Sequence, residues 1–160
     1  MKTNRVLKMG DQKGFSLIEI IVAVAIIGIL TGIAIPVYIG MKPSIRLSGA
    51  IRQIMGDLMW ARMQAISQNN QFRIIYYNNY QYKILDDDNN DGAITTGESV
   101  ITKDIHEEYY DVTYSSSNLN GLIFHPRGNA SNLTTITLTN SSGTKPKKLV
   151  IAITGRVQIE

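Results

Sequence analysis

The chain begins with two patterns of apolar residues that follow one another. From residue 20 to residue 38, nineteen consecutive residues carry no charge and are mostly Ile, Val, Ala and Leu. This is about the length that a helix needs to cross the ~30 Å hydrocarbon layer of a membrane. Beyond Pro36, apolar residues recur at steps of three and four, the period of a helix with one buried face. They are Leu47, Ile51, Ile54, Leu58, Ala61 and Ala65. Together the patterns predict one nearly continuous helix over residues 15–69.

From residue 72 onward, the apolar residues fall in short runs that are typical of strands. The predicted strands cover residues 72–77, 80–85, 99–105, 111–114, 122–125, 134–139, 149–154 and 156–159. Asn78-Asn79 and Thr154-Gly155 are predicted as two-residue hairpin turns, because Asn and Gly tolerate a positive φ. A helix followed by a series of strands indicates an α+β fold, in which the second half of the helix packs on an antiparallel β head.

Basic residues precede the apolar run and predict its orientation. Lys2, Arg5, Lys8 and Lys13 all lie before it, and the large polar remainder of the chain follows it. Because Lys and Arg favour the cytoplasmic side of a membrane, we expect a single-pass protein with a cytoplasmic N-terminus and its head outside. One alternative is a secretory signal peptide, but its apolar core has about 7–15 residues and this run is longer.

The charge of the chain is unevenly distributed. The formal net charge of +3 arises in the first fourteen residues, and residues 15–160 contain twelve basic and twelve acidic side chains. Nucleic-acid binding therefore cannot be inferred from the overall charge. Residues 83–111 carry nine acidic and two basic side chains, a net of −7, and residues 121–160 carry five basic and one acidic, a net of +4. Either these are two solvated faces or the polarity orients the head against neighbours.

Glu19 lies at the start of the apolar run, where a carboxylate is costly. An ionised side chain at the centre of a membrane helix costs about 2.5–3.5 kcal/mol on insertion scales, so such residues usually have a partner and a function. Cleavage between Gly14 and Phe15 would create an α-amino group four residues before Glu19, and positions i and i+4 are neighbours on a helix. The two groups could then neutralise each other within one chain or between chains. Alternatively, the segment is a plain membrane anchor that tolerates Glu19 near its end.

Residues 13–19, Lys-Gly-Phe-Ser-Leu-Ile-Glu, followed by the apolar run, resemble the type III signal of type IV pilins and type II secretion pseudopilins. The resemblance implies that a prepilin peptidase cuts after Gly14 and methylates Phe15. It also implies that Glu19 helps to recruit the subunit into a filament by pairing with a neighbour's N-terminus. The expected partners are other pilins or pseudopilins, the peptidase, the inner-membrane assembly platform and the lipid bilayer. The expected location is the bacterial inner membrane, and then a pilus or pseudopilus.

This resemblance divides the chain into four predicted parts. They are a prepilin leader (1–14), a transmembrane and assembly half of the helix (15–40), an amphipathic half (41–70) and a β-rich globular head (71–160). Within the first half, Gly28 and Gly32 form a G-x-x-x-G pair that permits close helix approach, and Pro36 removes one helical hydrogen bond. These three residues either serve assembly or reflect the frequency of Gly and Pro in membrane helices.

Two C-terminal blocks indicate the subfamily. Phe124-His125-Pro126-Arg127-Gly128, and the hydrophobic strand followed by Gly155-Arg156-Val157, resemble blocks of minor pseudopilins of the GspH/FimT kind. With the N-terminal signal, the resemblance covers most of the chain, loosely in the middle. It implies a minor rather than a major filament subunit.

The acidic stretch from Asp87 to Glu98 fits the calcium-loop pattern D-x-N-x-D-G-x₅-E. The predicted ligands are Asp87, Asn89, Asp91, the carbonyl of Ala93 and Glu98, with Gly92 at the tight turn. The flanking segments are predicted as strands, so this would be a calcium-type loop placed between two strands. The alternative is a solvated connection rich in turn-forming Asp, Asn and Gly.

A second candidate function is DNA binding for DNA uptake. A DNA-uptake relative of this family uses a C-terminal G-R-x-R motif, and the corresponding residues here are Gly155-Arg156-Val157-Gln158. Glutamine at the second arginine position removes a phosphate-binding charge. Lys145, Lys147 and Lys148 are the cations nearest in sequence that would compensate, although a lysine-rich loop is usually just solvated.

The sequence offers little for catalysis. It contains no cysteine, no nucleophile elbow, no phosphate-binding loop, no dinucleotide fingerprint and no pair of histidines at ligand spacing, and His106 and His125 are isolated. We therefore expect a protein that is not an enzyme and that has no cofactor other than a possible Ca²⁺. A membrane-anchored domain unrelated to filaments is the generic alternative.

Overall fold

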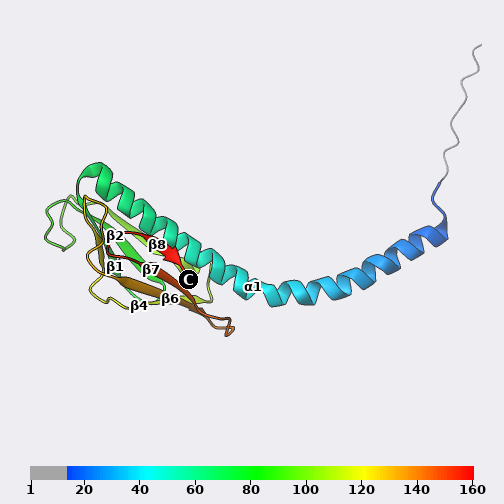
Figure 1. Cartoon of the computed structure of the whole chain (residues 1–160). Helices are drawn as coiled ribbons and strands as arrows, with labels where there is room; N and C mark the ends of the chain where they lie inside the picture. The colour runs from blue at the N-terminus through cyan, green and yellow to red at the C-terminus, as the bar shows by residue number, and fades with distance from the viewer. Residues whose placement is uncertain (1–13) are drawn as a thin grey trace, which may run out of the picture. The chain divides into compact units, whose positions relative to one another are not determined.

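The computed structural model describes residues 14–160, so most of the predicted leader lies outside the described residues. The described chain divides into a unit that ends at residue 40 and a unit of residues 41–160, which we call the head unit. Helix α1, Leu17–Gln68, belongs to both units (Figure 1). The predicted long helix is therefore confirmed, and it continues through Pro36 and Pro43 without a break. It ends where Asn69 adopts a left-handed conformation (φ 56°) and the Asn70 N–H donates to the Ala65 carbonyl (3.1 Å). This is the usual way to cap the last free carbonyls of a helix.

The strands of the head unit form two antiparallel four-stranded sheets. The first has the order β3-β2-β1-β5, with β1 Gln71–Tyr76, β2 Gln81–Asp87, β3 Val100–Asp104 and β5 Leu122–Phe124. The second has the order β4-β6-β7-β8, with β4 Val112–Ser116, β6 Thr134–Asn140, β7 Lys147–Ile151 and β8 Val157–Ile159. A short 3₁₀ helix, Ile105–Glu107, lies between β3 and β4. Each of the eight predicted runs overlaps one of these strands, so the α+β prediction is confirmed.

The two predicted hairpin turns are longer than expected. Between β1 and β2, the Tyr77 N–H donates to the Gln81 carbonyl (3.0 Å), which leaves a three-residue loop. The Asn78 side chain accepts from the N–H groups of Tyr80 and Gln81 and so replaces a backbone turn. Between β7 and β8, the Ala152 N–H donates to the Arg156 carbonyl (2.9 Å), and Gly155 has φ 81°. Three-residue loops with a left-handed glycine at the end are a common alternative to the two-residue turn.

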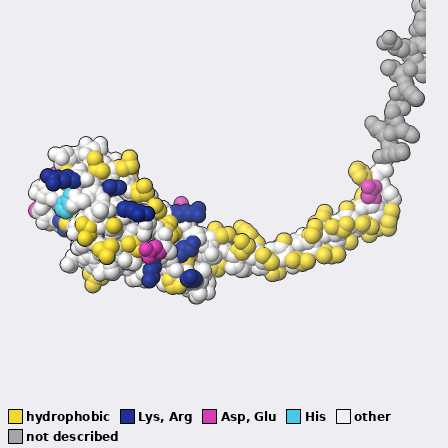
Figure 2. Space-filling model, in the orientation of Figure 1, with side chains coloured by type: hydrophobic (Ala, Val, Ile, Leu, Met, Phe, Trp, Pro, Cys, Tyr) yellow, Lys and Arg dark blue, Asp and Glu magenta, His cyan; other side chains and the backbone are white. Residues whose placement is uncertain are grey.

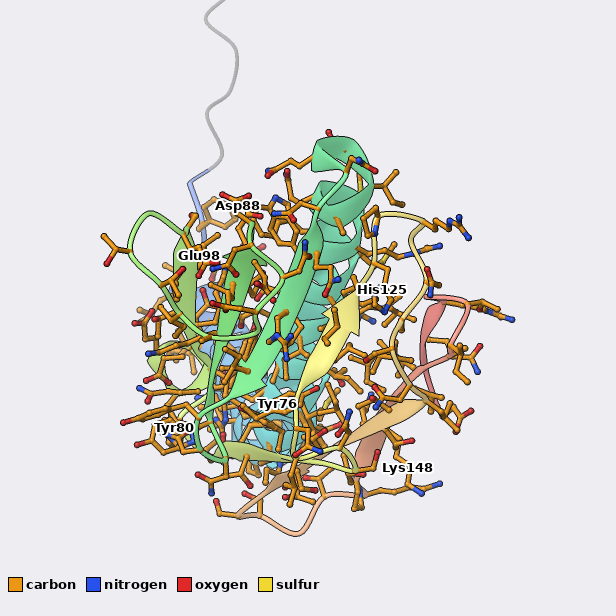
Figure 3. All side chains as sticks on the ribbon, turned by 90° about the vertical axis from the view of Figure 1, so that its left-hand side faces the viewer. Tyr76, Tyr80, Asp88, Glu98, His125 and Lys148 are labelled. Atoms are coloured by element: carbon orange, nitrogen blue, oxygen red, sulfur yellow. The ribbon has the colours of Figure 1, made fainter. Side chains whose placement is uncertain are left out.

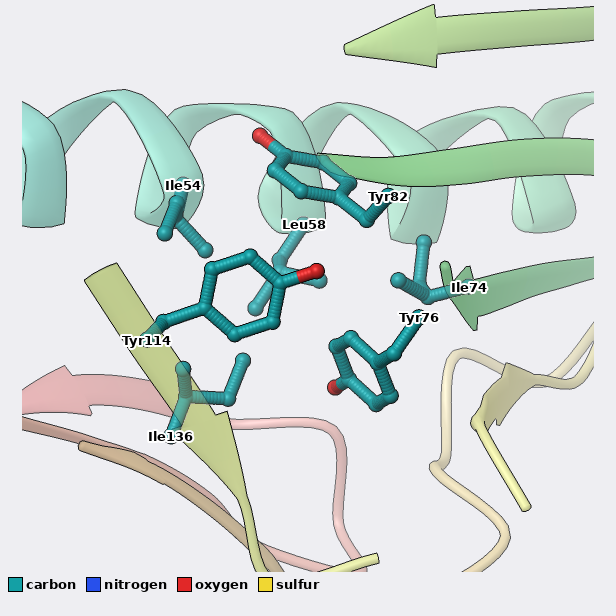
Figure 4. Close-up of a pocket in the computed structure, with 7 residues that line it drawn as sticks. All are labelled: Ile54, Leu58, Ile74, Tyr76, Tyr82, Tyr114 and Ile136. Carbon is teal, nitrogen blue, oxygen red and sulfur yellow. The ribbon is translucent and has the colours of Figure 1, made fainter. Parts of the chain in front are cut away.

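One face of α1 forms the centre of the core. The buried helix residues are Leu47, Ala50, Ile51, Ile54, Leu58, Ala61 and Ala65, and both sheets lie against this side of the helix (Figure 1). Between helix and sheets, Tyr76, Tyr82 and Tyr114 surround a narrow void that is too small for a water molecule (Figure 4). The Tyr82 hydroxyl donates to Asp57 of the helix (2.6 Å), and the Tyr114 hydroxyl donates to the Gln81 carbonyl (2.6 Å).

Polar contacts fix the position of the helix along the head. The Arg46 guanidinium forms two hydrogen bonds with the Asp111 carboxylate (2.6 and 2.8 Å) and lies over the ring of Tyr110. Gly49 leaves room for Tyr109, because a Cβ there would lie 2.6 Å from the tyrosine ring. The hydrogen bond from Arg46 lowers the pKa of Asp111. The pair therefore stabilises the folded head unit while Asp111 is ionised.

Replacing Asp111 by Asn removes this ion pair, and we expect a lower melting temperature of the full chain in detergent at neutral pH. Because the Asp111 pKa is lowered on folding, the stabilisation is complete above the ordinary aspartate pKa of 3.8 and is lost as the pH falls through the lowered value. The difference between wild type and variant should therefore shrink in acid. Glu107→Gln, an exposed change at the same end of the head unit, is the control. Equal melting temperatures of Asp111→Asn and wild type at neutral pH would contradict the proposed effect.

Candidate functional site

The start of α1 brings Phe15 and Glu19 to one place. The Ser16 carbonyl accepts from the N–H groups of Glu19 (3.0 Å) and Ile20 (3.3 Å), which opens the helix. Phe15, Glu19 and Ile20 border the same surface hollow, and Phe15 is 81% exposed. Glu19 lies in the first turn, where the positive end of the helix dipole favours a carboxylate. The side chain of Glu19 and the backbone of Phe15 are thus within one helical turn of each other.

The rest of this segment is an apolar helix with an exposed surface. Its side chains are exposed from residue 17 to residue 42, and its surface is largely hydrophobic (Figure 2). α1 is long and apolar enough to cross a membrane. At Gly28 and Gly32 a Cβ would meet no atom within 4 Å. Within the described part of the single chain, therefore, no other segment makes use of the space that these two glycines leave on the helix surface.

The acidic loop folds so that its carboxylates converge. Asp87, the last residue of β2, is fully buried and accepts from the Gly92 N–H (3.1 Å). Gly92 has φ 76°, which fits the tight turn expected there. One oxygen from each of Asp87, Asp91 and Glu98 lies within 4.8 Å of the others. Oxygens on opposite sides of a calcium ion are separated by up to about 5 Å, so the spacing fits this metal.

The other predicted calcium ligands shape the loop itself. The Asn89 side-chain oxygen accepts from the Asp91 N–H (2.9 Å), and the Ala93 N–H donates to Asp91 (2.7 Å). Glu98 accepts from the Thr95 N–H through Oε2 (2.8 Å), while its buried Oε1 has no hydrogen-bond partner among the described residues. Asp88 and Glu98 lie together on one side of the head unit (Figure 3).

Arg73 of β1 also reaches this loop, which the sequence did not indicate. Its Nη2 lies 3.3 Å from Asp87 Oδ2, and its guanidinium lies directly against Gly92. Arg73 pairs with Leu85 across the sheet, so its side chain emerges beside Asp87. Because strand register is not visible in the sequence, only the single basic residue in an otherwise apolar strand could have suggested this contact.

Comparison with known families decides what kind of protein this is. Residues 50–155 match the family described as type II transport protein GspH, and residues 9–35 match the prokaryotic N-terminal methylation motif. The chain belongs to the GspH family. As a member of this family it is a minor pilin or pseudopilin, a subunit of a type IV pilus or of a type II secretion filament.

Individual proteins similar to this GspH-family chain agree with the assignment. The pilin-like protein PilA1 of Thermus thermophilus is 26% identical over 157 residues, which are 93% of this chain and 99% of that protein. The type IV minor pilin FimU of Pseudomonas aeruginosa matches 71% of this chain and 91% of its own, with a TM-score of 0.53 and 18% identity. The minor pseudopilin EpsH of Vibrio cholerae matches 68% of this chain and 91% of its own, with a TM-score of 0.52 and 10% identity. The two solved structures show a shared fold.

The two C-terminal blocks that resemble GspH-type subunits meet in space. Gly155 lies against the Gly128 carbonyl, and the same carbonyl accepts from Nε of Arg62 on α1 (2.7 Å). A Cβ on Gly155 would overlap this carbonyl oxygen and come within 2.7 Å of Arg62. The glycines of the two blocks therefore serve packing, because they let the two loops and the helix approach one another closely.

The structure separates the residues predicted to bind DNA. The Lys148 N–H donates to the Glu160 carbonyl at one end of the β7–β8 hairpin, whereas Arg156 pairs with Ala152 at the other end. Lys148 and His125 likewise lie well apart in Figure 3. Lys145 and Lys147 belong with Lys148, so the three lysines do not join Arg156. Arg156 instead lies next to the Gly155 contact with Arg62 and the Arg127-Gly128 loop. DNA binding by this GspH-family head stays a prediction.

Replacing Gly155 by Ala should destabilise the head unit by about 2 kcal/mol more than replacing Gly143 by Ala. Both glycines have a left-handed backbone, but of the two only Gly155 also has a close neighbour at the position of a Cβ. Gly143 has φ 68°, similar to the 81° of Gly155, but a Cβ there would meet nothing within 4 Å. Urea unfolding of the full chain in detergent, followed through the fluorescence of Trp60, measures both variants. Equal decreases in the free energy of unfolding for the two variants would contradict the proposed contact effect, because they would show that the backbone conformation alone matters.

Proposed function

We propose that the chain is made as a prepilin, cleaved after Gly14, methylated on Phe15 and assembled into its filament through α1. Before assembly it crosses the bacterial inner membrane once, with a cytoplasmic N-terminus and the head unit outside. The observation that carries this proposal is the position of Glu19. It is the only charged residue between residues 15 and 41, and it lies one turn from the proposed new N-terminus.

The proposed role of Glu19 follows from electrostatics in a medium of low dielectric constant. Removal of the leader by a prepilin peptidase creates an amine with a pKa near 8, which is mostly protonated at neutral pH. A neighbouring subunit that brings this amine to Glu19 neutralises a carboxylate that is costly to keep in lipid. The same contact joins the two chains, so processing and assembly are coupled. An assembly platform in the inner membrane would bring the subunits together.

Exposed helix surface supports contacts with neighbouring subunits along α1. In the apolar half, Gly28 and Gly32 leave open space on one side of the helix, and Pro36 removes a hydrogen bond that would hold its turn rigid. In the head unit, Met59, Met63 and Ile66 are 46–67% exposed and lie outside the buried stripe of α1. We assign these residues to packing within the filament. A structural rather than catalytic role follows for the whole chain.

Processing and assembly can be tested in the cell that makes the protein. We expect mass spectrometry to find the chain starting at Phe15 and heavier by one methyl group. Glu19→Ala should still be processed but should fail to enter filaments, because the carboxylate that meets the neighbour's amine is missing. Glu19→Gln keeps the shape and removes the charge, so it should fail as well. An intact leader on assembled protein, or normal incorporation of both variants, would overturn the proposal.

We infer in addition that the acidic loop binds calcium, with Asp87, Asp91 and Glu98 as carboxylate ligands. Asn89 and the Ala93 carbonyl are the further ligands of the pattern. The unpartnered Oε1 of Glu98 supports the inference, since a buried carboxylate oxygen is costly without a partner. Arg73 already supplies a positive charge beside Asp87, so calcium would have to compete with this guanidinium. Weak binding is expected for this reason.

Calorimetric titration of the full chain with calcium tests the loop. We expect saturable binding in the wild type and its loss in Glu98→Ala, which removes the bidentate ligand. Asp88→Ala, in the same loop but outside the converging group, should bind nearly as well as the wild type. Binding that survives Glu98→Ala would exclude this site, and no binding by the wild type would exclude calcium.

A further inference from the structure

A surface hollow of about 320 Å³ lies in the head unit between α1 and strands β1–β3. Trp60 and Phe72 are among its apolar lining residues, and Gln64, Asp86 and Ser99 are among its polar ones. Trp60 is 39% exposed, and its ring meets the ring of Phe72 nearly at a right angle, with centroids 6.1 Å apart. Phe72 therefore covers only part of the indole. A large aromatic surface remains open to a ligand.

The described residues that line the hollow include one carboxylate and no cation. The carboxylate belongs to Asp86. Asn70 donates to both Asp86 Oδ1 and Asp88 Oδ1 (2.7 Å each), which leaves Asp86 Oδ2 without a hydrogen-bond partner among the described residues. An anionic ligand would be repelled here, and a cation would be attracted.

A carboxylate beside an exposed indole is a combination that suits a guanidinium group. The planar guanidinium stacks on an aromatic face and also donates parallel hydrogen bonds to a carboxylate. Its remaining N–H groups need acceptors, and Gln64 and Ser99 also line the hollow. The Gln64 Oε1 accepts from Gln68 Nε2 (3.0 Å) and keeps one further lone pair. An ammonium group would use the charge but not the planar geometry. The chemistry therefore favours arginine over lysine.

The surroundings of the hollow indicate a protein as the source of this group. Trp60 is adjacent on the helix to the exposed apolar side chains of Met59 and Met63. These belong to the face of α1 that we assign to packing against neighbours. A hollow that continues such a face suits one side chain from the protein that covers it.

We propose that this hollow receives an arginine side chain from a neighbouring subunit of the filament. The identity of the partner rests on the proposed assembly function, whereas the recognition of arginine rests on the hollow alone. The inserted guanidinium would stack on Trp60 and pair with Asp86. This contact would fix the rotational position of one head against the next.

Trp60 is the only tryptophan of the chain, so its fluorescence reports on this site directly. The full chain in a non-ionic detergent is titrated with arginine blocked at both termini, with blocked citrulline as the uncharged analogue of the same shape, and with blocked glutamate. We expect a saturable change in Trp60 emission with arginine alone. Asp86→Asn should weaken this binding about tenfold. Glu107→Gln removes one negative charge elsewhere and should leave it unchanged.

Several results of the titration would overturn the proposal. One is the absence of any change in Trp60 emission with arginine, and another is an equal change with citrulline. The third is an unaltered affinity for arginine in an Asp86→Asn variant that melts at the same temperature as the wild type. The titration does not require filaments, so it can fail while the processing and assembly tests succeed. It can also succeed while those tests fail.

The partner is identified in assembled filaments. The chain has no cysteine, so Ser99→Cys provides a single thiol at the rim for a photoreactive cross-linker. We expect mass spectrometry to find a cross-linked peptide of another filament subunit that contains arginine next to the attachment point. A cross-link to a segment without arginine, or no cross-linked protein at all in filaments that contain the variant, would contradict the proposed contact.

Discussion

The burial of one face of α1 is the constraint on which the head unit depends. The seven buried helix residues from Leu47 to Ala65 belong to the same hydrophobic cluster as the inward-facing residues of both sheets. The two sheets share no ladder of hydrogen bonds, since each has its own order of four strands. The helix packs against both sheets in one core, and side-chain contacts such as that of Tyr114 with Gln81 also join them. Loss of its packing would remove the common support of both sheets, which is why small residues such as Ala61 and Ala65 lie where the helix must come close.

The same helix has to satisfy two different environments. Its first half exposes Ile, Val and Leu on every side, and such a surface is stable only in lipid or against other apolar helices. Its second half hides one stripe and leaves Met59, Met63 and Ile66 exposed on another. The chain alone therefore satisfies only part of its apolar surface. This property agrees with a filament subunit, for which the membrane and the neighbouring subunits supply the missing contacts.

Periodicity was sufficient to predict the elements of this fold but not the contacts between them. The helix and all eight strands follow from repeats of apolar residues, which are local signals. The hairpin loops were each predicted one residue too short, because the side chain of Asn78 and the left-handed Gly155 stabilise longer connections. Arg73 beside Asp87, and Arg62 on the Gly128 carbonyl, join residues that are far apart in sequence. Such contacts depend on strand register and helix rotation, which composition and spacing do not encode. Glu19, in contrast, could be identified from the sequence as a candidate functional residue, because a charge in an apolar run is costly wherever it occurs.

The contacts of α1 with the head unit make part of the helix intolerant of changes in length. Arg46 and Gly49 meet the segment from Tyr109 to Asp111. Further along the helix, Asp57 meets Tyr82 of β2 and Arg62 meets the Gly128 carbonyl, so three segments of the head are contacted in a fixed order. Inserting or deleting one residue between Arg46 and Arg62 would turn everything beyond it by about 100°, so contacts on one side of the change would be lost. Evolution must therefore conserve the number of helix residues between these contacts, even where the identity of the intervening residues changes.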